Sequence, residues 1–301
     1  MTSLPLHTVV TPPADPKPLR LANQQAQLLT GRPYLSFSQI TVMRACPQKF
    51  SLHYVQHAQP AFIPASLIFG SAVHAAVEHY FRGQLTGASV SLSDLQQAYR
   101  LSWGEERARC DLPVRYGKSE DEARLEDLSG RMIEAFLASP AAQPAGTLLG
   151  IEEELTVTLD DPTLPDVQAR VDLVYDTPDA IVVRDFKTSR GKWNEDKAQE
   201  SADQLILYGR VLRQLAKGMA KPVQGEFVVL TKQKSPQVQV MPVFITPEAI
   251  RRTHDAIATT WQAVLAGNFY PAPGPMNCAT CQYKRYCPIF GGKGATGEVP
   301  A

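Results

Sequence analysis

Two acids and one lysine in the middle of the chain have the types and spacing of a metal-dependent hydrolytic site. Asp172 interrupts the apolar alternation A-R-V-D-L-V-Y, and Asp185 and Lys187 flank Phe186 in the segment V-V-R-D-F-K-T. Side chains alternate between the two faces of a strand, so Asp185 and Lys187 are expected to point the same way. A short turn, D-T-P-D, joins the two segments. In an antiparallel hairpin Asp172 would lie across from or beside Asp185.

Such a group suits the hydrolysis of a phosphodiester bond. Carboxylates are hard oxygen ligands for Mg²⁺ or Mn²⁺, and Mg²⁺ usually takes only one or two of them, which leaves room for a phosphate oxygen. A bound metal makes its water easier to deprotonate and stabilises the charge of the transition state. The ammonium of Lys187 would hold the attacking water and a non-bridging oxygen. The same residues also fit a surface hairpin with a solvated Asp–Lys pair, because D-x-K is a short pattern.

The cysteines indicate a second site that is ligated by sulfur. Cys278, Cys281 and Cys287 lie within ten residues, and Cys46 precedes a proline far upstream. Four thiolates can hold a zinc ion or an iron–sulfur cluster. Zinc ribbons usually have two C-x-x-C pairs, whereas this chain has one such pair. Cys110 matches no motif and is expected to be a spare buried thiol.

The elements that must position these residues follow a mixed α/β order. Apolar residues at helical spacing predict a helix over 66–81, and a further helix that begins at Ser36 or Ser38 and is kinked or ended by Pro47. Alternating patterns predict the strands. The remaining ranges are helical stretches over 91–110 and 120–138, strands over 151–158, 167–175 and 180–186, a helix over 197–217, strands over 224–231 and 238–244, and a helix over 247–265.

Composition and charge exclude several classes of protein. Hydrophobic residues make up 44% of the 301 residues and charged residues 20%, which is ordinary for a globular protein. The 30 Lys and Arg residues balance 30 Asp and Glu residues, which excludes a generally cationic coat for nucleic acid. Residues 88–179 hold 8 basic and 19 acidic residues, whereas residues 181–293 hold 16 and 8. A basic rim beside an acidic site suits a polyanion near a divalent ion, although folding can also mix the two halves.

The sequence also predicts the cellular location of the protein and the conformation of its two terminal segments. No apolar run approaches the roughly 18 residues of a membrane span, so no membrane partner is expected. The N-terminal residues lack the pattern of a secretory signal, and five cysteines are too few for a disulfide framework. We therefore expect a cytoplasmic protein. The Pro-rich residues 1–33 are predicted to be a mobile tail, and residues 291–301 a disordered tail.

Six segments, taken in order, resemble the PD-(D/E)XK nuclease superfamily. More narrowly they resemble its RecB-type exonuclease family, which includes the nuclease domains of RecB and AddB and a CRISPR-associated nuclease with an iron–sulfur motif. The resemblance runs from residue 35 to residue 288. The segments are S-F-S-Q-I with A-C-P-Q-K-F around Cys46, F-G-S-A-V-H-A-A-V-E with His74, V-D-L with Asp172, R-D-F-K-T-S with Asp185 and Lys187, Q-L-I-L-Y from Gln204 to Tyr208, and C-x2-C-x5-C-P from Cys278 to Pro288.

The resemblance implies a fold and a domain plan. The fold would be a restriction-endonuclease-like α/β core, with a mixed central sheet flanked by helices, a helical N-terminal part and a C-terminal cysteine cluster. The nuclease domain would span residues 34–290. Residues 84–148, which fit the family least, would be a helical insertion. Cys46 would join residues 278–287 in a cluster lobe.

Residue roles are also implied by the resemblance. Asp172 and Asp185 would bind Mg²⁺ or Mn²⁺, and His74 would be a third ligand or would orient one. Lys187 would activate or position the water. Gln204 and Tyr208, on one helix face, would support Lys187 or the scissile strand.

The cysteines at 46, 278, 281 and 287 would hold a [4Fe–4S] cluster, again by resemblance. Glu152, Glu153 and Glu154 are expected to form a strand face and its edge rather than to bind metal; the alternative is that one of them points at the metal ions. Glu78, four residues after His74, fits either a brace for that histidine or a surface carboxylate.

The expected function is that of a Mg²⁺- or Mn²⁺-dependent DNA exonuclease. It would act on single strands or DNA ends in repair and recombination. The alternatives are a catalytically silent DNA-binding or scaffold subunit of a helicase–nuclease complex, and a nuclease that processes CRISPR spacers. The chain has no G-x-x-x-x-G-K-[ST] loop, so any helicase would be a separate partner.

Overall fold

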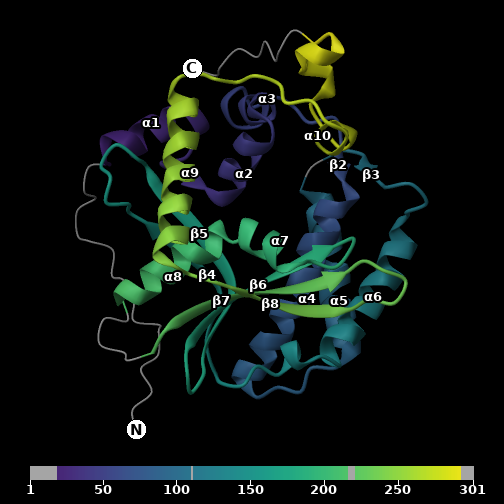
Figure 1. Cartoon of the computed structure of the whole chain (residues 1–301). Coiled ribbons are helices and arrows are strands. Elements are labelled where there is room, and N and C mark those ends of the chain that lie inside the picture. The colour runs from purple at the N-terminus through teal and green to yellow at the C-terminus, as the bar shows by residue number, and fades with distance from the viewer. Residues whose placement is uncertain (1–18, 110, 216–220, 293–301) are drawn as a thin grey trace. The chain divides into compact units, whose positions relative to one another are not determined.

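The computed structural model describes residues 19–109, 111–215 and 221–292 (Figure 1). Contacts divide these residues into two compact units. Unit 1 comprises residues 63–154 and 170–250, and unit 2 comprises residues 19–62, 155–169 and 251–292, with the gaps just given. Cys110 lies outside the described residues. Among the helices that are described, none is both long and apolar enough to cross a membrane.

Unit 1 is built on a mixed sheet in which the expected strands appear. They are β4 (Thr147–Val157), β5 (Asp166–Asp176), β6 (Ile181–Ser189), β7 (Val223–Thr231) and β8 (Val238–Val243), with the last residues of β4 and the first of β5 assigned to unit 2. The spatial order is β5-β6-β7-β8, and β4 pairs with β5. β6 and β7 are parallel, whereas β5–β6 and β7–β8 are antiparallel. The predicted mixed α/β fold is confirmed.

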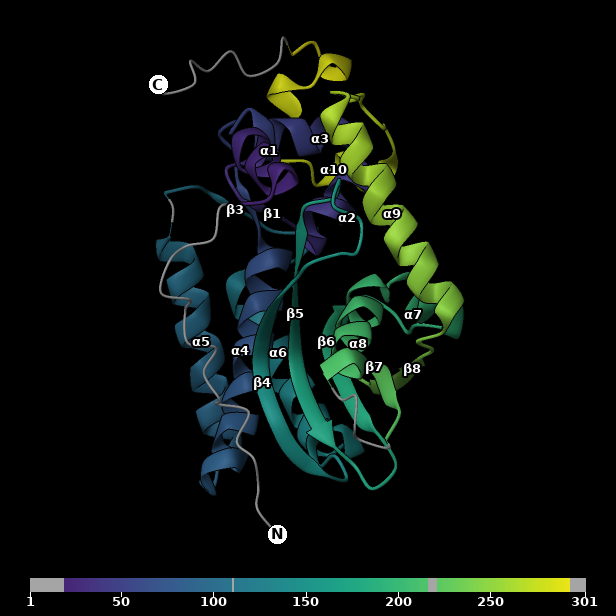
Figure 2. The same cartoon turned by 90° about the vertical axis from the view of Figure 1, so that its left-hand side faces the viewer.

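Helices cover both faces of this sheet. α4 (Ala65–Thr86), α5 (Leu92–Ala108) and α6 (Glu122–Leu137) lie on one face, and α8 (Asp203–Leu215) packs against β6 and β7 on the other (Figure 2). The predicted stripe of α4 is buried at Phe69, Val73 and Val77 and packs against strand residues such as Phe186. Smaller elements of unit 1 are the strand pair β2 (Ile63–Pro64) and β3 (Val114–Arg115) and the 3₁₀ turn Pro140–Ala142.

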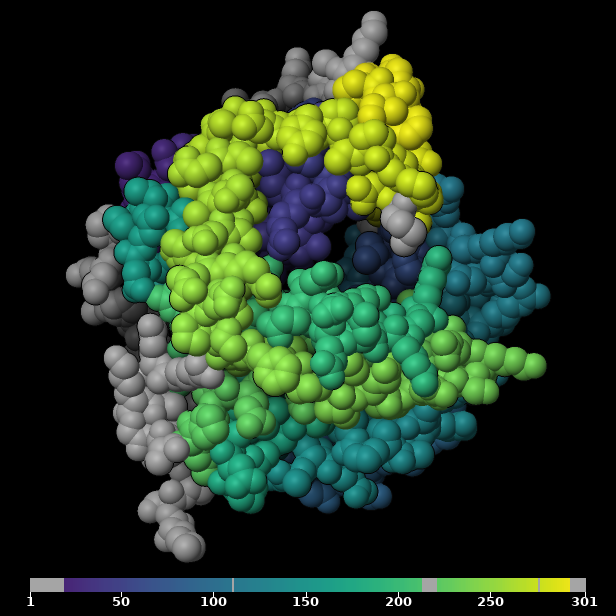
Figure 3. All heavy atoms as spheres, viewed as in Figure 1, coloured from purple at the N-terminus to yellow at the C-terminus, as the bar shows by residue number. Residues whose placement is uncertain are grey.

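The single helix predicted over 197–217 is wrong, because the chain forms two helices there. α7 (Glu195–Glu200) is capped by Asn194, whose side chain accepts a hydrogen bond from the Lys197 N–H. α8 then starts anew with Asp203 in its first turn. α7 and the edge strand β8 lie side by side at the surface of unit 1 (Figure 3). The Gln199 amide bonds both the N–H and the C=O of Phe244, which satisfies the backbone just beyond the end of β8.

Unit 2 is mainly helical. Its elements are α1 (Leu21–Thr30), β1 (Tyr34–Ser36), α2 (Phe37–Ala45), α3 (Pro47–Phe50), the π-helix Ser51–Val55, most of α9 (Pro247–Leu265), α10 (Pro275–Ala279), and the 3₁₀ turns Lys284–Tyr286 and Pro288–Phe290. Ser36 and Gln39 form a reciprocal capping box at the start of α2. α2 ends before Pro47, as the position of this proline predicts.

The expected tail over residues 1–33 is wrong in its described part, residues 19–33. Helix α1 buries Ala22, Asn23 and Ala26 rather than a stripe of large apolar side chains. Asp166 anchors it, because this carboxylate is 2.9 Å from Arg20 Nη1 and 2.7 Å from Asn23 Nδ2. Polar anchors replace the apolar periodicity that identifies helices in a sequence. Of the tail expected over 291–301, residues 293–301 lie outside the described residues.

A buried network fixes the strands of unit 1 next to the acidic residues. Arg184 is 3% exposed, and its guanidinium donates to Glu226 Oε1 at 2.6 Å, to the Ala141 C=O at 2.7 Å and to the Tyr175 hydroxyl at 2.9 Å. The Tyr175 hydroxyl also donates to Glu226. The network joins β5, β6 and β7. The charge of Arg184 can be buried here only because its hydrogen-bonding partners are in place.

Glu226→Ala is therefore expected to destabilise the protein by about 3 kcal/mol, because it leaves Arg184 buried without its carboxylate. Glu126→Ala is the matched control, since it breaks an Arg100–Glu126 pair whose side chains are 47% and 44% exposed. That change should lower the free energy of unfolding by no more than about 1 kcal/mol. Urea unfolding measures both, and equal losses would contradict the role given to the buried network.

Candidate metal centre

The predicted acids lie in unit 1 where β5 and β6 separate. The ladder between these strands runs from Asp176 paired with Ile181 to Leu173 paired with Arg184. Asp172 and Asp185 are the next residues along the two strands. The Phe186 N–H then donates to Asp172 Oδ2 at 2.6 Å. A carboxylate thus satisfies a backbone group just beyond the end of the ladder, and this bond holds Asp172 against β6.

Helix α4 places His74 beside Asp172. His74 Nδ1 is 3.4 Å from Asp172 Oδ2. Burial acts to lower the pKa of His74, but the charge and hydrogen bonding of Asp172 outweigh it, and the pKa is raised. Burial acts to raise the pKa of Asp172, but His74, Lys187 and the Phe186 N–H together lower it. The two shifts favour an imidazolium–carboxylate pair when no metal is bound.

Asp185 and Lys187 share one face of β6, as the strand alternation predicts. Lys187 Nζ is 2.5 Å from Asp185 Oδ2 and 5.7 Å from the centre of the Phe227 ring. Burial raises the pKa of Asp185 to about 6, against the effect of Lys187 and with a further rise from Asp172. Burial acts to lower the pKa of Lys187, but the two aspartates raise it overall. Lys187 is therefore an ammonium at neutral pH.

The structure adds Glu152, which the sequence analysis had assigned to a strand face. One ligand atom from each of His74, Glu152 and Asp172 lies within 4.8 Å of the other two. Asp185 stands outside this group and next to Lys187. Glu152 has a φ of 56°, a left-handed conformation that is unusual for a residue with a side chain. The alternation of buried and exposed residues along β4 also breaks here, because the neighbours Gly150 and Ile151 are both buried.

A small cavity of about 10 Å³ lies among the three side chains. This is close to the minimum space for one bound water or ion. Its polar lining consists of His74, Glu78, Glu152 and Asp172, and its apolar lining of Val77, Phe81, Ile151 and Phe186. Carboxylate oxygens and an imidazole nitrogen suit a divalent cation such as Mg²⁺ or Mn²⁺. A larger hollow of about 340 Å³ is lined by α5 and α6 instead.

Gln204 and Tyr208 lie on α8, which packs against the strand that carries Asp185. Tyr208 is buried, at 2% exposure. Burial and the charge of Glu153 raise the pKa of its hydroxyl. The charge that acts on the Tyr208 hydroxyl is thus that of Glu153. Support of Lys187 by Gln204 and Tyr208 stays a prediction.

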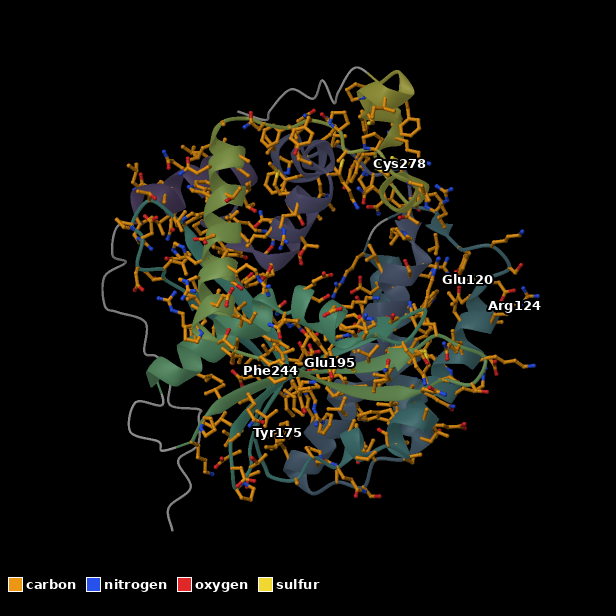
Figure 4. All side chains as sticks on the ribbon, in the orientation of Figure 1. Glu120, Arg124, Tyr175, Glu195, Phe244 and Cys278 are labelled. Carbon is orange, nitrogen blue, oxygen red and sulfur yellow. The ribbon has the colours of Figure 1, made fainter. Side chains whose placement is uncertain are left out.

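The four predicted cysteines gather in unit 2. All four are reduced and partly buried, and Figure 4 shows Cys278 in the C-terminal segment. Burial raises the pKa of Cys281, and the charges of Cys46 and Cys287 add to the rise. The Asn277 side chain donates to the Ala45 C=O at 2.8 Å, which ties the residue before Cys278 to the residue before Cys46. The chain thus brings these distant cysteines into one region, and their ligand role stays a prediction.

Comparison with known proteins places these features in a family. The chain is 23% identical over 295 residues to the Gene 69 protein of Mycobacterium phage L5, covering 86% of this chain and 97% of that protein. It resembles the crystal structure of a putative exonuclease from Eubacterium rectale with a TM-score of 0.52, at 14% identity and 92% coverage of each chain. This structural likeness supports the fold. The family model of the PD-(D/E)XK nuclease superfamily matches residues 34–288. The chain therefore belongs to the PD-(D/E)XK nuclease superfamily.

Proposed function

We propose that the protein is a Mg²⁺- or Mn²⁺-dependent deoxyribonuclease that hydrolyses phosphodiester bonds at the cavity of unit 1. The observation that carries the proposal is the convergence of Asp172, Asp185, Lys187 and His74 where β5 and β6 separate. Membership of the PD-(D/E)XK nuclease superfamily supports nuclease activity. The donor atoms fit a hard divalent ion, because they are carboxylate oxygens and one imidazole nitrogen.

Each residue has a task in this proposal. His74, Glu152 and Asp172 would hold the ion, and Asp185 would join them or orient the water. When bound, the ion activates a water and offsets negative charge on the phosphate. Lys187 is cationic, so it would position the water and stabilise a non-bridging oxygen rather than accept a proton. Phe186 contributes its N–H, which fixes the orientation of Asp172.

We further propose exonuclease action on single strands or DNA ends, in repair and recombination, as in RecB-type nucleases. The six segments of that family's pattern support this choice, and the Eubacterium rectale protein of similar fold is itself described as a putative exonuclease. A helicase, if one takes part, would be a separate subunit, because the chain lacks a Walker loop. A silent scaffold is less well supported, because all four predicted positions hold residues able to act.

The cysteines of unit 2 are proposed to bind a [4Fe–4S] cluster. The donor set, four thiols, fits either this cluster or zinc. Zinc ribbons usually have two C-x-x-C pairs, whereas this chain has one such pair. The C-x2-C-x5-C-P segment with its remote C-P partner resembles the [4Fe–4S] arrangement of the RecB-type family, and this resemblance supports the cluster.

Asp172→Asn, Asp185→Asn and Lys187→Met should each lower the rate of DNA cleavage by about 10³-fold, which is about 4 kcal/mol of transition-state stabilisation. Labelled single-stranded DNA with Mn²⁺ is the assay, and melting temperatures confirm folding. Asp127→Asn is the control, because that side chain is 71% exposed on α6 and should leave the rate unchanged. Wild-type protein that never cuts, and that the Asp185 variant matches, would favour the scaffold.

Mn²⁺ affinity should rise as the pH increases through about 6 and should go on rising through the raised pKa of His74. The pKa of Asp185 is about 6, and that of His74 is raised, so both groups carry protons at low pH that the ion must displace. Between pH 5.5 and 7.5 the affinity should increase by about tenfold or more. Calorimetric titration measures it. Asp185→Asn should flatten the profile to the part that His74 contributes, and an unchanged profile in that variant would contradict the assignment of Asp185.

Protein purified without oxygen should be brown, with a broad absorbance band near about 400 nm from iron–sulfur charge transfer. Cys281→Ser should lose the band and most of the iron. Thr280→Ser, at the neighbouring position, should retain both. A colourless wild-type protein that contains one zinc per chain would replace the cluster with a zinc site and leave the metal centre of unit 1 untouched.

A further inference from the structure

A guanidinium lies against the acidic residues of unit 1. Arg170 lies on β5 two residues before Asp172, and its Nε is 2.5 Å from Glu152 Oε2. Its Nη2 contacts the same oxygen. The side chain of Glu152 is 10% exposed and that of Arg170 is 60% exposed, so the guanidinium reaches Glu152 from the solvent side.

Arg170 lies in the field of all three carboxylates that line the cavity. Burial acts to lower the pKa of Arg170, but Glu152, Asp172 and Glu78 raise it overall. Glu152 responds to the same neighbours: burial and Asp172 raise the pKa of this carboxyl, and Arg170 opposes them. The guanidinium therefore offsets repulsion that would otherwise push the acids apart.

The backbone of Glu152 shows why this contact matters. A φ of 56° within a strand is rarely adopted by a residue with a Cβ, and it persists only where surrounding contacts impose it. This conformation turns the carboxylate toward His74 and Asp172, where the three ligand atoms meet. Arg170 contacts the carboxylate at that position, so it helps to hold the unusual conformation.

We propose that Arg170 is a tethered counter-cation that holds Glu152 in place before metal binds and competes with the divalent ion for its carboxylate. This inference rests on the proposed metal-dependent function and deepens it, because it names the residue that limits the affinity of the site. Arg170 is a positioning residue and acts through Glu152. An ion that binds Glu152 through Oε2 would have to displace the guanidinium from this oxygen.

The central test is a double-mutant cycle on the full chain, with Mn²⁺ affinity measured by calorimetry at pH 7.5. Arg170→Gln should raise the affinity by about tenfold, because it removes both the competitor and a positive charge near the ion. Glu152→Gln should lower the affinity by about tenfold. In the Glu152→Gln background the further change Arg170→Gln should raise the affinity by less than about threefold. A gain of equal size in both backgrounds would overturn the competition.

Stability gives a second readout that does not depend on activity. Without metal, Arg170→Gln should melt at a lower temperature than wild type, because the acids lose their counter-cation. Saturating Mn²⁺ should close that gap, since the ion takes over the same role. Arg100→Gln is the matched control: its exposed pair with Glu126 joins α5 to α6 rather than bordering the cavity, and it should change neither Mn²⁺ affinity nor the gap.

Asp172→Asn separates the two levels of the proposal. If this variant binds Mn²⁺ as wild type does, the metal centre itself is wrong and the role of Arg170 fails with it. If Asp172→Asn loses Mn²⁺ binding while Arg170→Gln binds as wild type does, the metal centre stands and the role of Arg170 alone is overturned.

Discussion

Negative charge gathered around one small cavity is the constraint on which the rest of unit 1 depends. Glu78, Glu152 and Asp172 line the cavity, and Asp185 follows at the end of the neighbouring strand. Buried carboxylates are unfavourable unless they are bonded, paired or bound to a cation. Each acid here has such a partner: Asp172 accepts the Phe186 N–H and faces His74, and the other acids pair with Lys187, Arg170 and Arg82. A divalent ion would satisfy several of them at once.

The fold of unit 1 holds the acidic residues at the point where the paired part of β5 and β6 ends. The Arg184–Glu226 network joins three strands directly before Asp185, so the end of β6 is held in a fixed position. The apolar stripe of α4 packs on the same sheet and carries His74 to the edge of the cavity. Beyond this point β5 and β6 no longer follow one ladder, and the Asp172 side chain rather than a backbone carbonyl accepts the Phe186 N–H. The polar site thus begins where regular strand pairing ends.

The sequence allowed the strands of the sheet and the pairing of Asp185 with Lys187 to be predicted, because both follow from a period of two. It did not allow Glu152 to be predicted, because that residue leaves the period of two through a left-handed backbone; a glycine inside a strand pattern, Gly150 two residues earlier, is a local sign of such a break. Helix α1 was missed for a different reason. Its buried positions are alanines and an asparagine that bonds Asp166, so no apolar stripe marks it. The break between α7 and α8 was missed because Ser201 and Ala202 do not interrupt a helical pattern.

Anomalous diffraction from a crystal of the protein soaked in Mn²⁺ is the most direct test of the metal centre. The expected result is one strong peak in the cavity of unit 1, within direct coordination distance of Asp172 and His74, with Glu152 turned toward it. A peak bound elsewhere, with this cavity empty and the His74–Asp172 pair intact, would contradict the assignment of the acidic residues to catalysis.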